Sequence, residues 1–145
     1  MTVPRVQHDF PASFALLILR LGAGGLLFLG HGWAKLVHYR EWAASFPDPL
    51  SVGSPVSFAL VVFAEVVCAP VVMLGLLTRL ATIPILIFLG VAGFIQLAHD
   101  PWTKRELAFI YAVPFLTLLL AGGGRFSLDG WLAGRRGRGG ETGGE

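Results

Sequence analysis

The sequence predicts an all-α membrane protein, an antiparallel bundle of four helices that cross a bilayer. Hydrophobic residues make up 54% of the 145 residues, charged residues only 14%, and the mean hydropathy is +0.70. The apolar residues form four runs, at 14–30, 55–77, 80–98 and 107–121. At about 1.5 Å per residue, each run spans most or all of a hydrocarbon core about 30 Å thick. Helices are the expected form, because lipid offers no partners to backbone N–H and C=O groups.

The first helix is expected at about 13–38, after an N-terminal segment, 1–12, that we place in the cytoplasm. The apolar run could be mistaken for a signal peptide. However, Arg20 interrupts it, Arg5 is the only basic residue before it, and no small-residue cleavage pattern closes it. We therefore expect a retained membrane helix. A rotation of about 100° per residue brings Arg20, His31 and Lys35 onto one narrow face of this helix.

The second helix, expected at about 55–77, carries a buried acid, Glu65. A lone charge at membrane depth costs about 2.5–3.5 kcal/mol on insertion scales. Counting residues from the helix ends places Arg20 and Glu65 near the same depth, so an Arg20–Glu65 ion pair is the economical hypothesis. Such a pair either stabilises the packing of the bundle or forms part of a functional site, and the sequence leaves both interpretations open.

The third and fourth helices are expected at about 80–98 and 106–122. Their ends bring three more polar residues, Gln96, His99 and Glu106, to the mouth where helix 1 places His31 and Lys35. Glu106 also fits a first-turn carboxylate that the helix dipole favours. Paired histidines from two helices are suitable ligands for haem or a metal, but no close-spaced motif accompanies them, so no metal site is predicted.

The orientation follows from lysine and arginine residues outside the helices. The side of the termini carries six, against four on the other side, which favours cytoplasmic termini: Arg5, Arg79, Arg125, Arg135, Arg136 and Arg138 against Lys35, Arg40, Lys104 and Arg105. The segment 133–145 is rich in Gly and Arg and is expected to be disordered. Its arginines could contact anionic lipid, but a basic tail that only fixes the topology is the simpler reading.

Several function classes are excluded or weakened by the same residues. The chain has one cysteine, Cys68, so a dithiol relay within this subunit is excluded. There is no glycine-rich phosphate loop and no nucleophile elbow, and a basic tail without interleaved aromatic residues does not indicate nucleic-acid binding. A small transporter is a weaker possibility, because no internal repeat is visible.

Taken in order, the polar motifs resemble those of the DoxX family of small four-helix membrane proteins. They are Leu-Arg-Leu-Gly at 19–22, His-Gly-Trp-Ala-Lys at 31–35, Glu65, Gly-Leu-Leu-Thr-Arg-Leu at 75–80, His99, Glu106, and Gly-Arg-Phe-Ser-Leu-Asp at 124–129. The resemblance covers about 16–132, and we take 13–132 as one transmembrane domain. It implies an inner-membrane protein linked to redox metabolism, because relatives include a subunit of thiosulfate:quinone oxidoreductase and members of complexes for thiol and oxidant defence.

The leading functional hypothesis is therefore a membrane subunit of a redox complex, an oxidoreductase subunit that needs a protein partner. Glu65 and Glu106 would pass protons, and a polar pocket would hold a quinone head group: Arg20, His31, Lys35, Gln96 and His99. No covalently bound cofactor is expected, and membrane lipids surround the chain, which could also form a homo-oligomer. The alternative is a non-catalytic scaffold or assembly protein of chaperone type, which presents the loop 39–54 to a partner.

Overall fold

The structure, a computed structural model, describes residues 10–138, and all regular elements in that range are helical. Three long helices, which we call spans 1, 2 and 3, cover Phe10–Val37, Ser54–Leu74 and Thr78–Gln96. Each is long and apolar enough to cross a membrane. Each also contains a short π-helical segment, so span 1 comprises α1 (Phe10–Leu27), η1 (Phe28–Gly32) and α2 (Trp33–Val37).

Span 2 comprises α4 (Ser54–Val62), η2 (Phe63–Cys68) and α5 (Ala69–Leu74), and span 3 comprises α6 (Thr78–Val91) and η3 (Ala92–Gln96). The fourth long helix is α7 (Trp102–Ala121). Three of its first five residues are charged, so its apolar part is only about 22 Å long. Two further helices lie outside the bundle, α3 (Tyr39–Trp42) and α8 (Leu128–Arg138).

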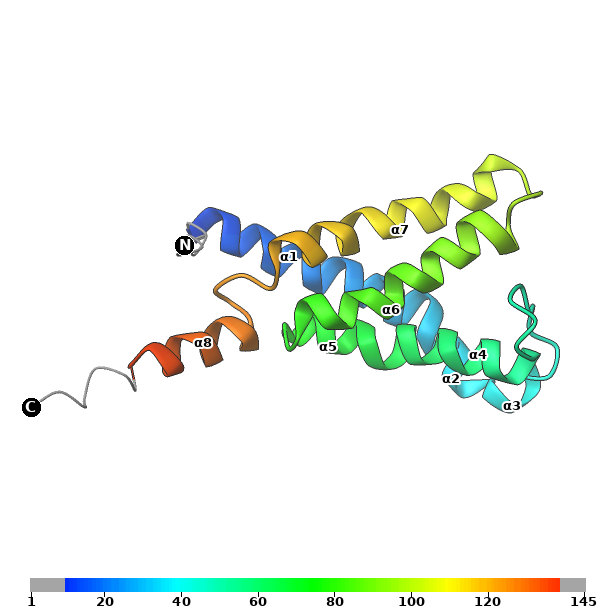
Figure 1. Cartoon of the computed structure of the whole chain (residues 1–145), viewed down its shortest axis with the longest axis horizontal. Helices are drawn as coiled ribbons and strands as arrows, with labels where there is room; N and C mark the ends of the chain where they lie inside the picture. Colours follow the sequence, from blue (N-terminus) through cyan, green and yellow to red (C-terminus); the bar gives the residue numbers. More distant parts are fainter. Residues whose placement is uncertain (1–9, 139–145) are drawn as a thin grey trace, which may run out of the picture.

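The four long helices run antiparallel (Figure 1), and their contacts close into a ring. α1 packs on α5, α5 on α6, α6 on α7, and α7 on α1. Both described ends of the chain lie at one end of the bundle, which we call the terminal end. The opposite, or loop, end holds α3, the 43–53 loop and the 97–101 turn. This arrangement confirms the predicted all-α antiparallel bundle.

The distribution of polarity is that of a protein surrounded by lipid. Several of the most exposed large side chains are aliphatic, including Leu29 at 70% and Leu120 at 71% exposure, whereas Arg20 and Glu65 are at most 1% exposed. A chain in water would bear the cost of these exposed groups, but a hydrocarbon solvent removes it. The apolar core between the helices centres on residues such as Leu27, Ile85 and Phe115.

Several helix boundaries differ from the expected ones, each for a local reason. Span 1 begins at Phe10, inside the segment expected to precede the helix. Span 2 ends at Leu74 rather than about residue 77, because Gly75 adopts a left-handed conformation and the N–H of Leu76 donates to the C=O of Val71, as in a Schellman motif.

The expectation of disorder from residue 133 onward is wrong for 133–138, which belong to α8. Ser127 is the N-cap of this helix, and its hydroxyl accepts a hydrogen bond from the N–H of Gly130 at 3.0 Å. The segments 1–9 and 139–145, which include Arg5 and the end of the tail, lie outside the described residues.

Candidate functional site

Polar side chains gather at two separate depths inside the bundle. A mid-span cluster contains Lys35, Glu65, His31 and Tyr111, which come from spans 1 and 2 and from α7. A terminal-end cluster contains Arg20, Thr78, Ser127 and Asp129. Along span 1, the backbone positions of Arg20 and Lys35 are about 22 Å apart, from a sequence separation of 15 residues at about 1.5 Å each.

An ion pair forms the centre of the mid-span cluster. The ammonium Nζ of Lys35 lies 2.6 Å from both carboxylate oxygens of Glu65. The Glu65 side chain is 1% exposed and that of Lys35 is 17% exposed. Since an unpaired charge at this depth is costly, each residue lowers the cost of burying the other.

Two local features of the sequence allow this close approach. Gly32 lies against Glu65, and a Cβ atom added at Gly32 would lie 3.1 Å from both the Cβ and the carbonyl oxygen of Glu65. The residues in contact also lie in the π-helical segments η1 and η2, which pack on each other. In η2, the N–H of Ala69 donates to the carbonyl of Ala64, five residues back. Such π-helical turns are frequently found at functional sites.

Two further rings complete the mid-span cluster. The His31 imidazole meets the Tyr111 ring edge to face, with a centroid separation of 5.6 Å. Tyr111 lies within electrostatic range of Glu65, and His31 within that of Lys35. Lys35 Nζ also lies 5.9 Å from the centroid of the Phe88 ring on span 3. All four long helices therefore contribute to this cluster.

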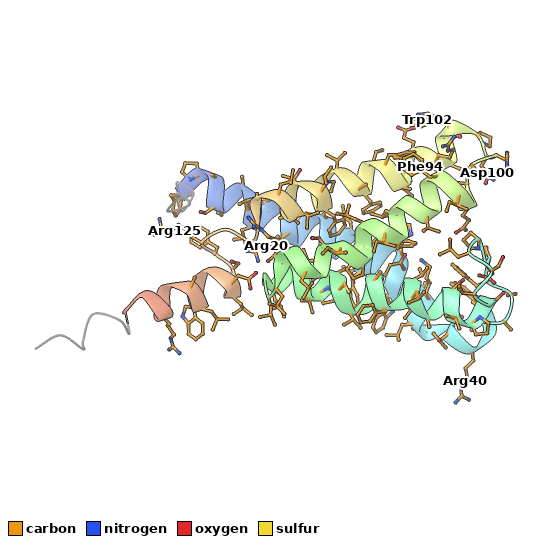
Figure 2. The ribbon with its side chains drawn as sticks, in the orientation of Figure 1. Arg20, Arg40, Phe94, Asp100, Trp102 and Arg125 are labelled. Carbon is orange, nitrogen blue, oxygen red and sulfur yellow. The ribbon has the colours of Figure 1, made fainter. Side chains whose placement is uncertain are left out.

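The proposed Arg20–Glu65 pair is wrong. The Arg20 guanidinium donates from Nη2 to the carbonyl of Phe126 at 2.6 Å and from Nη1 to that of Met73 at 3.3 Å. The error arises from depth, because span 1 begins early and extends beyond span 2, which puts Arg20 level with the end of span 2. Figure 2 shows Arg20 at the terminal end, far from Arg40 and Asp100 at the loop end.

The terminal-end cluster joins the end of span 2, the start of α6 and the segment that leads into α8, and Arg20 reaches it from within α1. The Asp129 carboxylate accepts hydrogen bonds from the N–H groups of Leu77 and Thr78 and from the Thr78 hydroxyl, at 2.7–2.9 Å. It thereby caps the first turn of α6 from a distant segment, where negative charge is favourable. Gly75 makes room for this junction, since an added Cβ would overlap the Arg20 Nη1 and Ser127 Cβ atoms.

Besides Arg20, three of the predicted site residues are not brought into contact with the mid-span cluster. Gln96, at the end of span 3, His99, in the next turn, and Glu106, in the first turns of α7, are all exposed at the loop end. Among the described residues, none of the three forms a hydrogen bond or ion pair with Glu65, Lys35 or His31. The polar residues predicted to meet at one end of the bundle therefore fall into two groups. One is the Lys35–Glu65 ion pair, and the other is an exposed set at the loop end, which we call the exposed rim: Gln96, His99 and Glu106.

The sequence analysis missed Tyr111, Phe88 and the role of Asp129. A tyrosine inside the last apolar run was the available signal for Tyr111. Phe88 had no signal, because one aromatic residue among many aliphatic ones does not indicate a site. Asp129 belongs to a motif that the sequence analysis identified, but its partners lie 51 and 52 residues away.

The loop between α3 and α4 is held by Asp48. Its carboxylate accepts hydrogen bonds from the Ser57 hydroxyl and the Gly53 N–H, both at 2.7 Å, and from the Val52 N–H at 3.1 Å. The Ser57 hydroxyl makes the largest contribution to holding the pKa of Asp48 below its usual value, and the backbone N–H groups add to it. Within residues 10–138, no group of three or more His, Cys, Asp or Glu side chains is placed to hold a metal ion.

Comparison with known proteins identifies the family. The DoxX family profile matches residues 15–98, which contain Arg20, Lys35 and Glu65. The chain belongs to the DoxX family. This DoxX protein is also 33% identical to an uncharacterised membrane protein of Mycobacterium tuberculosis, over 91% of this chain and 89% of the relative. No solved structure matches the chain. The family assignment and the apolar exterior together establish a membrane protein.

Proposed function

We propose that this DoxX protein is the membrane subunit of a redox complex and binds a quinone head group at the mid-span cluster. The observation that carries the proposal is the buried Lys35–Glu65 pair, flanked by two rings that bear polar atoms, His31 and Tyr111. Intramembrane ionisable residues commonly mark sites or proton pathways. These four groups supply several proton donors and acceptors in one small volume.

The chemistry requires both electrons and protons. A partner subunit would oxidise two thiols to a disulfide, releasing their two protons to water, or would join two thiosulfate ions through a new S–S bond. Either reaction releases two electrons. The quinone would take up these two electrons and two protons, one on each ring oxygen, and leave as quinol. Lys35 would donate a hydrogen bond to a ring carbonyl and stabilise the negative charge that develops there, and Glu65 would pass protons.

A partner is part of this proposal because the chain has a single cysteine, Cys68, which is buried at 5% exposure. Oxidation of a sulfur donor through a disulfide needs two thiols, so it would take place on another polypeptide. We further propose that the complex lies in the inner membrane, with both termini of this chain in the cytoplasm.

The proposed roles of Arg20 and Glu106 change accordingly. Arg20 is committed to two backbone carbonyls at the terminal end, so we assign it a bundle-locking role. Glu106, Gln96 and His99 lie on the exposed rim, and we propose that they contact the partner or the lipid interface rather than the quinone head group.

The test is purification from native membranes in mild detergent, with mass spectrometry of copurifying proteins and extracted quinones. The wild type should carry quinone and a redox partner. Glu65→Gln should keep the fold and the partner but lose quinone reduction. Glu41→Gln is the matched control for the loss of a glutamate charge, since Glu41 is exposed on α3, and it should behave as wild type. A wild-type sample with neither quinone nor a redox partner would refute the proposal.

The alternative is a non-catalytic membrane scaffold, and one observation favours it. The polar residues of the terminal-end cluster join α1, the end of span 2, the start of α6 and the segment that leads into α8, as a structural framework requires. Under this alternative, deleting the chain would disperse a partner complex, while Glu65→Gln would leave both the assembly and the redox activity of that complex unchanged.

A further inference from the structure

We propose that an apolar pocket beside the mid-span cluster takes the isoprenoid tail of the quinone. This inference rests on the proposed function and names the substrate class as a tailed, membrane-resident quinone. The pocket lies between spans 2 and 3 at the loop end and has a volume of about 300 Å³. Its lining includes Leu60, Phe63, Ile87, Phe88 and Val91.

One aromatic ring, that of Phe88, borders both the pocket and the ion pair. Phe88 lines the pocket, and Lys35 Nζ lies 5.9 Å from the centroid of the same ring. A molecule with a polar head and an apolar chain matches this sequence of surroundings: the ammonium first, then the aromatic ring, then aliphatic walls.

Depth favours a quinone over a phospholipid. Phe88 lies ten residues after Thr78 and eight before Gln96, so it is about 15 Å and 12 Å from the two ends of span 3. A phospholipid keeps its charged phosphate at the interface, because moving charge into hydrocarbon is costly. The uncharged head group of a quinone can reach the depth of Phe88, so its tail is the better occupant.

The pocket opens toward lipid. Two of its lining residues, Leu60 on span 2 and Ile87 on span 3, are 56% and 61% exposed on the outer surface of the bundle. Figure 1 shows α4 and α6 diverging toward the loop end, on the side where the 43–53 loop lies. A hydrocarbon chain could therefore enter sideways between the two helices.

The loop forms a fixed wall at the far end of the pocket. Phe46, Pro49 and Leu50 of the loop line the pocket, and the Phe46 ring packs against Phe58 at a centroid distance of 4.9 Å. Asp48 ties this loop to Ser57 at the start of span 2, and Ser57 also lines the pocket. The wall is thus held by hydrogen bonds and does not depend on an occupant.

The experiment compares a decyl-substituted benzoquinone with the same benzoquinone without the tail, each titrated against the full chain in nanodiscs. Val91→Phe fills the pocket from its lining. Ile87→Trp narrows its rim, and Leu80→Trp is the matched control, since Leu80 is 62% exposed on the same helix but does not line the pocket. Both pocket variants should weaken binding of the tailed quinone about tenfold, and the tailless quinone should bind as to wild type.

The outcomes separate this inference from the proposed function. If the tailed quinone binds both pocket variants as tightly as it binds wild type and Leu80→Trp, the tail inference is overturned, while the head-group site stands. If neither quinone binds the wild type, both proposals are overturned. If a phospholipid copurifies with the wild type and is lost from Val91→Phe, the pocket belongs to that lipid and the quinone tail is excluded from it. Because Ile87 is exposed, Ile87→Trp keeps the test valid if Val91→Phe does not fold.

Discussion

Arg20, which is fully buried, and Lys35, which is partly buried, are two cations on span 1, and the bundle stabilises them in different ways. Lys35 has a carboxylate partner, Glu65, at 2.6 Å. Arg20 has two carbonyl acceptors, of which Met73 lies in the last turn of span 2, where the helix dipole favours a cation. Its Nε is buried without a hydrogen-bond partner in the described structure. Lys35 is therefore paired directly with a titratable group, whereas Arg20 donates its hydrogen bonds to backbone carbonyls.

This difference gives a prediction for the ion pair. Lys35→Met and Glu65→Met each leave one buried charge without a partner, and each should cost about 3–5 kcal/mol of unfolding free energy. The double variant removes both charges, so it should recover most of this loss. Unfolding in detergent, followed for the wild type, both single variants and the double variant, measures the coupling energy.

Two other outcomes of this double-mutant cycle would change the interpretation of the ion pair. If the two single losses simply add in the double variant, Lys35 and Glu65 are not energetically coupled. If the double variant is as stable as the wild type but no longer reduces quinone, the pair serves function rather than stability.

For Arg20, the expected result is a loss of stability without a loss of ligand. Arg20→Met removes the donors for two carbonyls, each worth about 1–3 kcal/mol if it is left buried and unsatisfied. The melting temperature should fall clearly. Quinone affinity of the folded fraction should stay at the wild-type value, because Arg20 is about 22 Å from Lys35 along span 1. A selective loss of quinone in a stable Arg20→Met protein would contradict the bundle-locking role.

The sequence was sufficient to identify the buried polar residues, but not their partners. Arg20 and Glu65 are recognisable because charges are rare in apolar runs, whereas Lys35 lies beyond the run 14–30 and was counted among the charges outside the membrane. Pairing depends on the offset between helices along the bundle axis, and the early start of span 1 at Phe10 changed that offset. Tyr111 and Phe88 join the cluster only through packing of α7 and α6, which no local pattern specifies.

At the scale of the elements, the approach of spans 1 and 2 is set by glycine. Gly32 faces Glu65 closely, whereas Gly30, one half-turn earlier, has no atom within 4 Å of an added Cβ. The two residues lie in the same π-helical segment, so helix propensity affects both substitutions similarly.

We predict that Gly32→Ala pushes the helices apart by a few tenths of an ångström and weakens the Lys35–Glu65 pair. Its unfolding free energy should fall by about 1–3 kcal/mol, as for other overpacked sites. Gly30→Ala should be neutral or slightly stabilising, because alanine favours the helix by up to about 1 kcal/mol. Thermal unfolding of the two variants in the same detergent makes the comparison, and equal effects would show that close approach at Gly32 is not the cause.

The 43–53 loop gives a prediction about pH. The hydrogen bond from Ser57, followed by those from the backbone, holds the pKa of Asp48 below its unfolded value of about 3.9. A lowered folded-state pKa contributes stability that is complete above the unfolded pKa and is lost as the pH falls through the folded one. The loop should therefore stay ordered at neutral pH and loosen only below about pH 4.

Amide NMR signals of Val52 and Gly53, recorded in detergent as the pH is lowered, measure this loosening of the 43–53 loop. Both amides donate to the Asp48 carboxylate, so they should shift together when it takes up a proton. Asp48→Asn should abolish the transition. A transition of equal size in Asp48→Asn would assign the effect to another group.

At the scale of the whole molecule, the structure changes the charge count that orients the bundle. Lys35 was counted among four cations on the loop side, but it is bound to Glu65 inside the bundle. Without Lys35, the terminal side carries six lysine and arginine residues outside the bundle and the loop side carries three. Arg79 reinforces that side by donating to the carbonyl of Leu120, near the end of α7. Positive charge favours the cytoplasmic side of the membrane, so the larger margin strengthens the proposed orientation.

The orientation can be tested by cysteine labelling, for which this chain is well suited. Its single native cysteine can be removed by Cys68→Ala, and new cysteines can then be placed at the loop end, by Ser45→Cys, and at the terminal end, by Arg135→Cys. Both positions are exposed. With a membrane-impermeant maleimide on intact cells, Ser45→Cys should be labelled and Arg135→Cys should not, because arginine-rich ends stay in the cytoplasm. Arg135→Cys should react once the cells are lysed, and the reverse pattern on intact cells would place the termini outside.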